Sequence, residues 1–97
     1  MVVFELRVAN APTWNGKFSG EGNYYAETVA IRDKNKVKEI VEKGTYHYRW
    51  DDGWSVNIKA FEVDSKDAAK IRRRSKGFMG YDWMIDSIIE KGHISED

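Results

Sequence analysis

The sequence has 97 residues, of which 41% are hydrophobic, 33% are charged and one is proline. This length and balance predict a single globular domain over residues 1–97 and exclude low-complexity disorder. A formal net charge of zero excludes a global field toward nucleic acid or membrane, and the lack of cysteine excludes a disulfide framework and a thiolate nucleophile.

The N-terminal part predicts two strands separated by a long loop. Residues 2–9 alternate apolar and polar side chains, which is typical of a strand with one apolar face. Residues 10–22 hold glycines, a proline and two large aromatic residues, and predict a loop that either caps the core or has a binding role. Residues 23–32 are rich in β-forming residues and predict the second strand.

A short helix and a β-hairpin follow. Helical spacing of apolar residues predicts a helix over about residues 34–43, with Asp33 as its N-cap and Gly44 at its left-handed end. Residues 45–59 then alternate apolar and polar side chains on both sides of an Asp-Asp-Gly turn, which predicts a hairpin.

The turn of this hairpin decides its register. A two-residue turn would place the apolar set of the second strand opposite the polar set of the first. A three-residue loop over residues 51–53 instead pairs Trp50 with Trp54, and all the large apolar side chains share one face. We therefore predict the three-residue loop, with Gly53 left-handed, and interpret both tryptophans as structural.

Two helices close the chain. The first is predicted to start after Asp64 or Ser65, to carry little apolar surface and to end at Gly77. The last covers about residues 81–91, with apolar residues at helical spacing and Gly92 as its stop. The predicted fold is of the α+β class: a mostly antiparallel sheet of three to four strands with two to three helices packed on one face.

No motif predicts a named catalytic chemistry. The two histidines, His47 and His93, lack the spacing of converging metal ligands, so we expect no metal and no cofactor. His47 beside Ser55 or Thr45 is the only base–nucleophile pair that the hairpin offers, and it has no third group to orient it. We therefore expect a protein that is not an enzyme.

Cations are concentrated late in the chain. Residues 66–76 contain six lysines and arginines and one acidic residue. Helical spacing places Lys70, Arg73 and Arg74 on one side, and Phe78 follows closely. Cations beside exposed aromatic residues are typical of single-stranded nucleic-acid contact. The alternative is a solvated helix face whose positive charges balance the acidic terminal helix. The neutrality of the whole chain favours this alternative.

The aromatic content indicates a protein-binding surface. Four tryptophans and five tyrosines exceed the needs of one small core, and Trp, Tyr and Arg dominate interface hot spots. The candidate binding residues are Trp14, Arg73, Arg74, Lys76, Phe78 and Trp83.

Two stretches carry a resemblance to a known class of proteins. The compact aromatic hairpin of residues 46–54 and the closing residues 77–84 make the chain resemble small accessory proteins of tailed bacteriophages. The resemblance implies a protein that acts by binding, often by blocking or redirecting a host factor such as a defence system.

These observations leave three hypotheses. The leading one is a non-enzymatic binding protein, an inhibitor or modulator of a host protein that acts by protein–protein contact. The others are a nucleic-acid-binding protein using residues 66–76 with neighbouring aromatic residues, and a small-molecule binder or small enzyme with residues 10–22 as a lid. In each case the lack of a signal peptide or long apolar run predicts a cytoplasmic protein without membrane contact.

Overall fold

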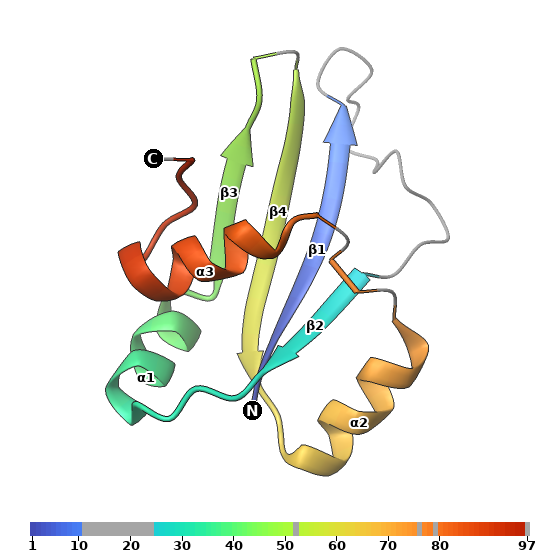
Figure 1. Ribbon diagram of the computed structural model, residues 1–97, viewed down its shortest axis with the longest axis vertical. Coiled ribbons are helices and arrows are strands. Elements are labelled where there is room, and N and C mark those ends of the chain that lie inside the picture. Colours follow the sequence, from blue (N-terminus) through green and yellow to red (C-terminus); the bar gives the residue numbers. More distant parts are fainter. Residues whose placement is uncertain (11–24, 52, 76, 79, 97) are drawn as a thin grey trace.

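The computed structural model describes residues 1–10, 25–51, 53–75, 77–78 and 80–96, which contain a four-stranded antiparallel sheet and three helices (Figure 1). The strands are β1 (Val2–Asn10), β2 (Tyr25–Val29), β3 (Thr45–Arg49) and β4 (Trp54–Glu62), and the helices are α1 (Lys34–Lys43), α2 (Ser65–Arg74) and α3 (Asp82–Lys91). Their order in the sheet is β2-β1-β4-β3. The predicted α+β class is confirmed, and the predicted loop lies, from residue 11 onward, outside the described residues.

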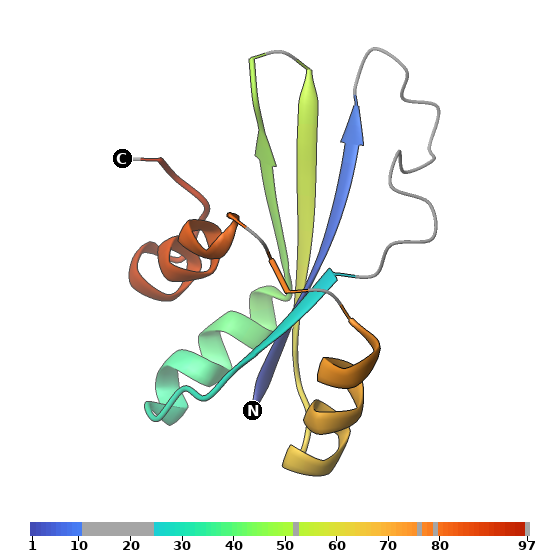
Figure 2. The same ribbon diagram turned by 45° about the vertical axis from the view of Figure 1, so that its right-hand side comes forward.

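Two helices, α1 and α3, pack side by side on one face of the sheet, as predicted. Ile40 of α1 and Ile88 of α3 are buried together with Phe4 and Ile58 of the central strands, and these residues belong to the main core. Figure 2 shows α1 and α3 on the same side of the sheet. The main core therefore fills the space between these two helices and one face of β1 and β4.

The third helix, α2, covers the opposite face of the sheet (Figure 2). Its Ile71 is buried against Val3 and Ala26, with Phe61 packed beside them. Both Val3 and its neighbours along β1 are apolar, so this end of β1 is apolar on both faces. A second apolar face needs its own cover, and α2 provides it.

The hairpin has the register of the predicted three-residue loop. Tyr48 pairs with Val56, and the backbone N–H of Trp50 donates to the carbonyl of Trp54 at 2.7 Å. The N–H of Gly53 donates to the carbonyl of Trp50 at 3.1 Å, and the φ of Gly53 is 95°. A residue with a Cβ would be strained at that angle, which explains the glycine.

The helix ends follow the predicted capping residues. The side chain of Asp33 accepts the N–H of Asn35 at 2.9 Å, and the side chain of Asp64 accepts the N–H of Asp67 at 2.8 Å. Gly92 ends α3 in the left-handed conformation, with φ at 79°. These local contacts satisfy backbone groups that the helices themselves leave without partners.

The predicted end of α2 at Gly77 is wrong, because the helix ends at Arg74. Ser75 already has extended backbone, with φ at −108° and ψ at 159°. Its hydroxyl donates to the carbonyl of Ala26 in β2 at 3.3 Å. This tertiary contact draws the chain back to the sheet two residues before Gly77.

A buried tyrosine joins α1 to the sheet. Tyr46 of β3 is 3% exposed, and its hydroxyl donates to the carbonyl of Ile40 at 3.1 Å. The ammonium group of Lys43 lies 4.8 Å from the centre of the ring. Burial raises the pKa of the Tyr46 hydroxyl above its ordinary value, because the phenolate would lose its hydration.

We predict that this tyrosine makes the fold sensitive to alkali. Since the pKa is higher in the folded state, its contribution to stability is complete below about pH 10 and is lost as the pH rises through the folded value. Tyr46→Phe should cost about 1 kcal/mol near neutrality, from the lost hydrogen bond, and should remove this alkaline loss. Urea unfolding of both proteins across this range measures the difference. An equal alkaline loss in both proteins would contradict the assignment.

Candidate binding surfaces

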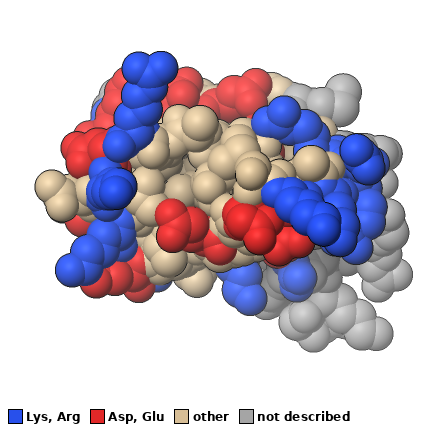
Figure 3. Space-filling view, turned by 90° about the horizontal axis from the view of Figure 1, so that it is seen from below, with Lys and Arg blue, Asp and Glu red and all other residues tan. Residues whose placement is uncertain are grey.

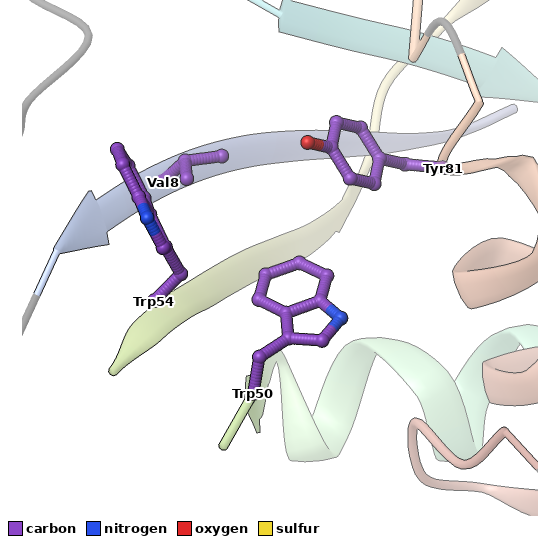
Figure 4. A pocket seen from close by; sticks show the side chains of 4 residues that line it. All are labelled: Val8, Trp50, Trp54 and Tyr81. Atoms are coloured by element: carbon purple, nitrogen blue, oxygen red, sulfur yellow. The ribbon is translucent and has the colours of Figure 1, made fainter. Parts of the chain in front are cut away.

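An aromatic pocket lies at the end of the sheet that carries the hairpin turn. Among the described residues, four from β1, the hairpin and the start of α3 line it: Val8, Trp50, Trp54 and Tyr81. Its volume is about 340 Å³, which falls in the usual range for binding pockets. Figure 4 shows the four side chains around a central space, with the hydroxyl of Tyr81 directed into it. We refer to these four residues as the aromatic pocket.

Aromatic contacts between the hairpin and α3 hold the pocket walls. The ring of Tyr48 packs edge-to-face against Trp50, with centroids 5.2 Å apart, and against Trp83, with centroids 5.6 Å apart. The ring of Trp50 in turn lies 6.1 Å from that of Tyr81. The two hairpin rings therefore lie between Trp83 and Tyr81, and such pairs add about 0.5–1.5 kcal/mol each beyond area burial. The start of α3 is thereby fixed against the hairpin, so Tyr81 forms one wall.

The pocket lies beyond the main core. Val56 is fully buried, whereas Trp54, two residues nearer the turn, is only partly buried. Figures 1 and 2 show β3, β4 and β1 extending past α3 at this end. The interpretation of both tryptophans as purely structural is therefore incomplete: Trp50 packs against the core and also lines the pocket, and Trp54 forms the facing wall.

The basic residues of α2 form a separate surface on the other face of the sheet. The exposed cations of this helix are Lys66, Lys70, Arg72, Arg73 and Arg74. Figure 3 shows Lys and Arg side chains gathered at the side where α2 lies. Because α2 and α3 cover opposite faces of the sheet, the alternative that these cations balance the negative charges of the acidic terminal helix is not supported.

The predicted site residues divide between core and surface. Phe78 is 1% exposed and belongs to the main core, so its predicted place in a binding surface is wrong. It is buried because the chain leaves α2 to cross back over the sheet before α3 begins. Trp83 is partly buried and packs against this core and Tyr48. Both aromatic residues therefore stabilise the attachment of α3.

The remaining predicted residues lie on α2 or outside the description. Arg73 and Arg74 are exposed in the last turn of α2. The three consecutive arginines of α2 lie at its C-terminal end, where the helix dipole is negative, and their positive charges there stabilise the helix. Trp14 and Lys76 lie outside the described residues. The structure thus brings the two arginines together and places them on the opposite face from Trp83.

The histidine of the hairpin is paired with an amide. Nδ1 of His47 lies 2.8 Å from Oδ1 of Asn57, so the ring nitrogen donates to the amide oxygen. Its partner is therefore neither of the hydroxyls of Ser55 and Thr45 that the sequence offered. In the described part of the chain, no three His, Asp or Glu side chains lie close enough together to hold a metal ion. None of the helices in that part of the chain is long and apolar enough to span a membrane.

Sequence reasoning missed the aromatic pocket although the signal was present. The predicted register already placed Trp50 beside Trp54 on the apolar face, two residues past Val56 towards the turn. What it did not show was that the helices stop short of this end and that Tyr81 closes one side.

Comparison with protein-family models, curated proteins and solved structures finds no match for this chain.

The assignment of Phe78 to the core can be tested by truncation. Phe78→Ala should lower the free energy of unfolding by about 3–5 kcal/mol, because it leaves a cavity in the main core. Arg74→Ala, at an exposed position nearby in the chain, should change it by less than about 0.5 kcal/mol. Urea denaturation measures both changes. A Phe78→Ala protein as stable as the parent would place this ring on the surface after all.

Proposed function

We propose that this chain is a non-enzymatic binding protein that contacts a partner protein through the aromatic pocket. The observation that carries the proposal is the position of Trp50, Trp54 and Tyr81 around a cavity at an end of the sheet that α1, α2 and α3 leave uncovered. Tryptophan and tyrosine are the residue types most enriched among hot spots, where a partner's side chain fills a desolvated pocket.

The chemistry of the pocket favours a protein partner over a substrate. The described part of its lining is made of three aromatic side chains and Val8, and it includes no carboxylate and no histidine. A site that orients a small polar substrate needs several convergent polar groups, and among the four side chains drawn in Figure 4 the Tyr81 hydroxyl points inward. A bulky apolar side chain of a partner suits this lining better.

The resemblance to small accessory proteins of tailed bacteriophages supports a finer proposal. Such proteins often block or redirect a host factor, so we propose that the partner is a host protein and that the chain inhibits or modulates it. The ring contacts of Trp50 with Tyr48 and Tyr81 suit such a role, because packed rings lose little conformational entropy when a partner binds.

The proposal predicts that one tryptophan dominates capture of the partner. Trp54→Ala should reduce the amount of partner recovered from a host-cell lysate by at least about tenfold, because a hot-spot truncation costs about 2 kcal/mol or more. Quantitative mass spectrometry of the captured proteins measures this change. Phe61→Ala is the matched control, since it removes a partly buried aromatic ring from the opposite face of the same strand.

Three results would contradict the proposal. The first is the absence of any protein recovered in stoichiometric amount with the parent chain. The second is equal recovery by the parent and by Trp54→Ala. The third is an equal loss in Phe61→Ala, which would indicate a general effect on the fold. Circular dichroism of all three proteins shows whether the fold is retained.

A further inference from the structure

A second cavity lies on the other face of the sheet, between α2 and β2. Its volume is about 270 Å³, and its lining residues are Met1, Thr28, Ser65, Ala68, Ala69, Arg72 and Arg73. The five residues from α2 recur at intervals of three and four, so they form one stripe along the helix. We refer to this cavity as the α2–β2 cleft.

One arginine of the cleft is held in place by the sheet. The guanidinium of Arg72 donates to the backbone carbonyl of Thr28 at 3.4 Å and also to its hydroxyl. Thr28 is 6% exposed, so this anchor is part of the packed structure. A guanidinium has five N–H groups in a rigid fork, and these bonds engage only part of it. Arg72 therefore presents oriented donors at low entropic cost.

The rest of the lining suits an oxyanion. Arg73 adds a second guanidinium, and Ser65 and Thr28 contribute hydroxyl groups. Alanines at positions 68 and 69 are small, which leaves room for a ligand between the two ends of the stripe. Among the described lining residues there is no carboxylate. The nearest acidic groups along the helix are Asp64 and Asp67, and the side chain of Asp64 is engaged in capping the helix.

We propose that the α2–β2 cleft binds a phosphate of a nucleic-acid backbone. Arginine forks match the geometry of phosphate oxygens, with two parallel hydrogen bonds from one side chain. Outside the cleft, the exposed Lys66 and Lys70 extend the positive surface along α2. Residues four apart on a helix are about 6 Å apart along its axis, so the helix offers a row of cations to a regularly charged chain.

This inference is independent of the proposed protein contact. The α2–β2 cleft and the aromatic pocket lie on opposite faces of the sheet, and none of the described residues lines both. Phe78, the aromatic residue expected beside the cations, is buried in the main core. Base stacking on that ring is therefore not part of the inference, which concerns the backbone phosphates alone.

Two neighbouring arginines provide a matched test. Arg73 lines the cleft and Arg74 does not, although both are exposed in the last turn of α2. Arg73→Gln and Arg74→Gln remove the same charge from adjacent positions. Binding of a fluorescent oligothymidine to each protein is measured by anisotropy at low salt and again at higher salt. We expect Arg73→Gln to weaken binding at least about tenfold, whereas Arg74→Gln weakens it by less than about threefold.

The inference fails on any of three outcomes. The first is a flat titration of the parent protein with single- and double-stranded oligonucleotides at low salt. Equal losses in the two variants would indicate diffuse attraction rather than a built site. Equally tight binding of a polyglutamate peptide of matched charge would indicate that the cleft takes carboxylates of an acidic protein. None of these outcomes bears on the capture of a partner by the aromatic pocket.

Discussion

The register of β4 between its two neighbours is the constraint on which the rest of the structure depends. β4 pairs along its whole length with β1 and along half of it with β3. A slip of one residue would move every side chain of the strand to the other face. Val56 and Ile58 would then leave the main core, and the layer of α1 and α3 would lose its support.

The same register creates the aromatic pocket. Trp50 and Trp54 follow the same alternation that places Tyr46 and Ile58 in the core, so their rings lie on the apolar face, nearer the turn than this buried pair. No helix among the described elements covers them there, and Tyr81 reaches them through its contact with Trp50. The apolar alternation of β3 and β4 thus continues past the part of the sheet that the helices cover, and there it forms a surface rich in hot-spot residue types.

The sheet is also apolar on both faces at the end where β1 begins, and this separates the two candidate surfaces. Val3 and Phe4 point to opposite faces, and each is fully buried by a different layer. Because α2 must cover the second face, its cations are placed on the far side of the molecule from the aromatic pocket. The chain therefore offers one apolar and one basic surface that could bind independently.

Local signals predicted much of the fold. The bounds of α1, the capping roles of Asp33 and Asp64 and the three-residue hairpin loop depend on residues close in sequence, and all are confirmed. The failures concern contacts between distant residues. The bond from Ser75 to Ala26 ends α2 early, and the return of the chain to the sheet buries Phe78.

The candidate site was predicted only in part for the same reason. Arg73 and Arg74 were expected on one side of a surface helix, and they are exposed on α2. The aromatic pocket, however, needs residues from β1, the hairpin and α3, whose approach depends on the assembled sheet. Periodicity shows which face of a strand is apolar, but it does not show how far the covering helices extend along that face.

Disulfide trapping of the hairpin tests the register most directly. Arg49 and Ser55 face each other across β3 and β4, and directly paired residues have the Cα separation that a disulfide requires. The chain has no cysteine, so a double Cys variant has no competing thiol. With Arg49→Cys and Ser55→Cys, mild oxidation should yield an intramolecular disulfide in nearly all molecules. The diagonal pair His47→Cys and Ser55→Cys, about 7–8 Å apart, should remain largely reduced. Preferential oxidation of the diagonal pair, or reduced thiols in both variants, would contradict the register and with it the aromatic pocket.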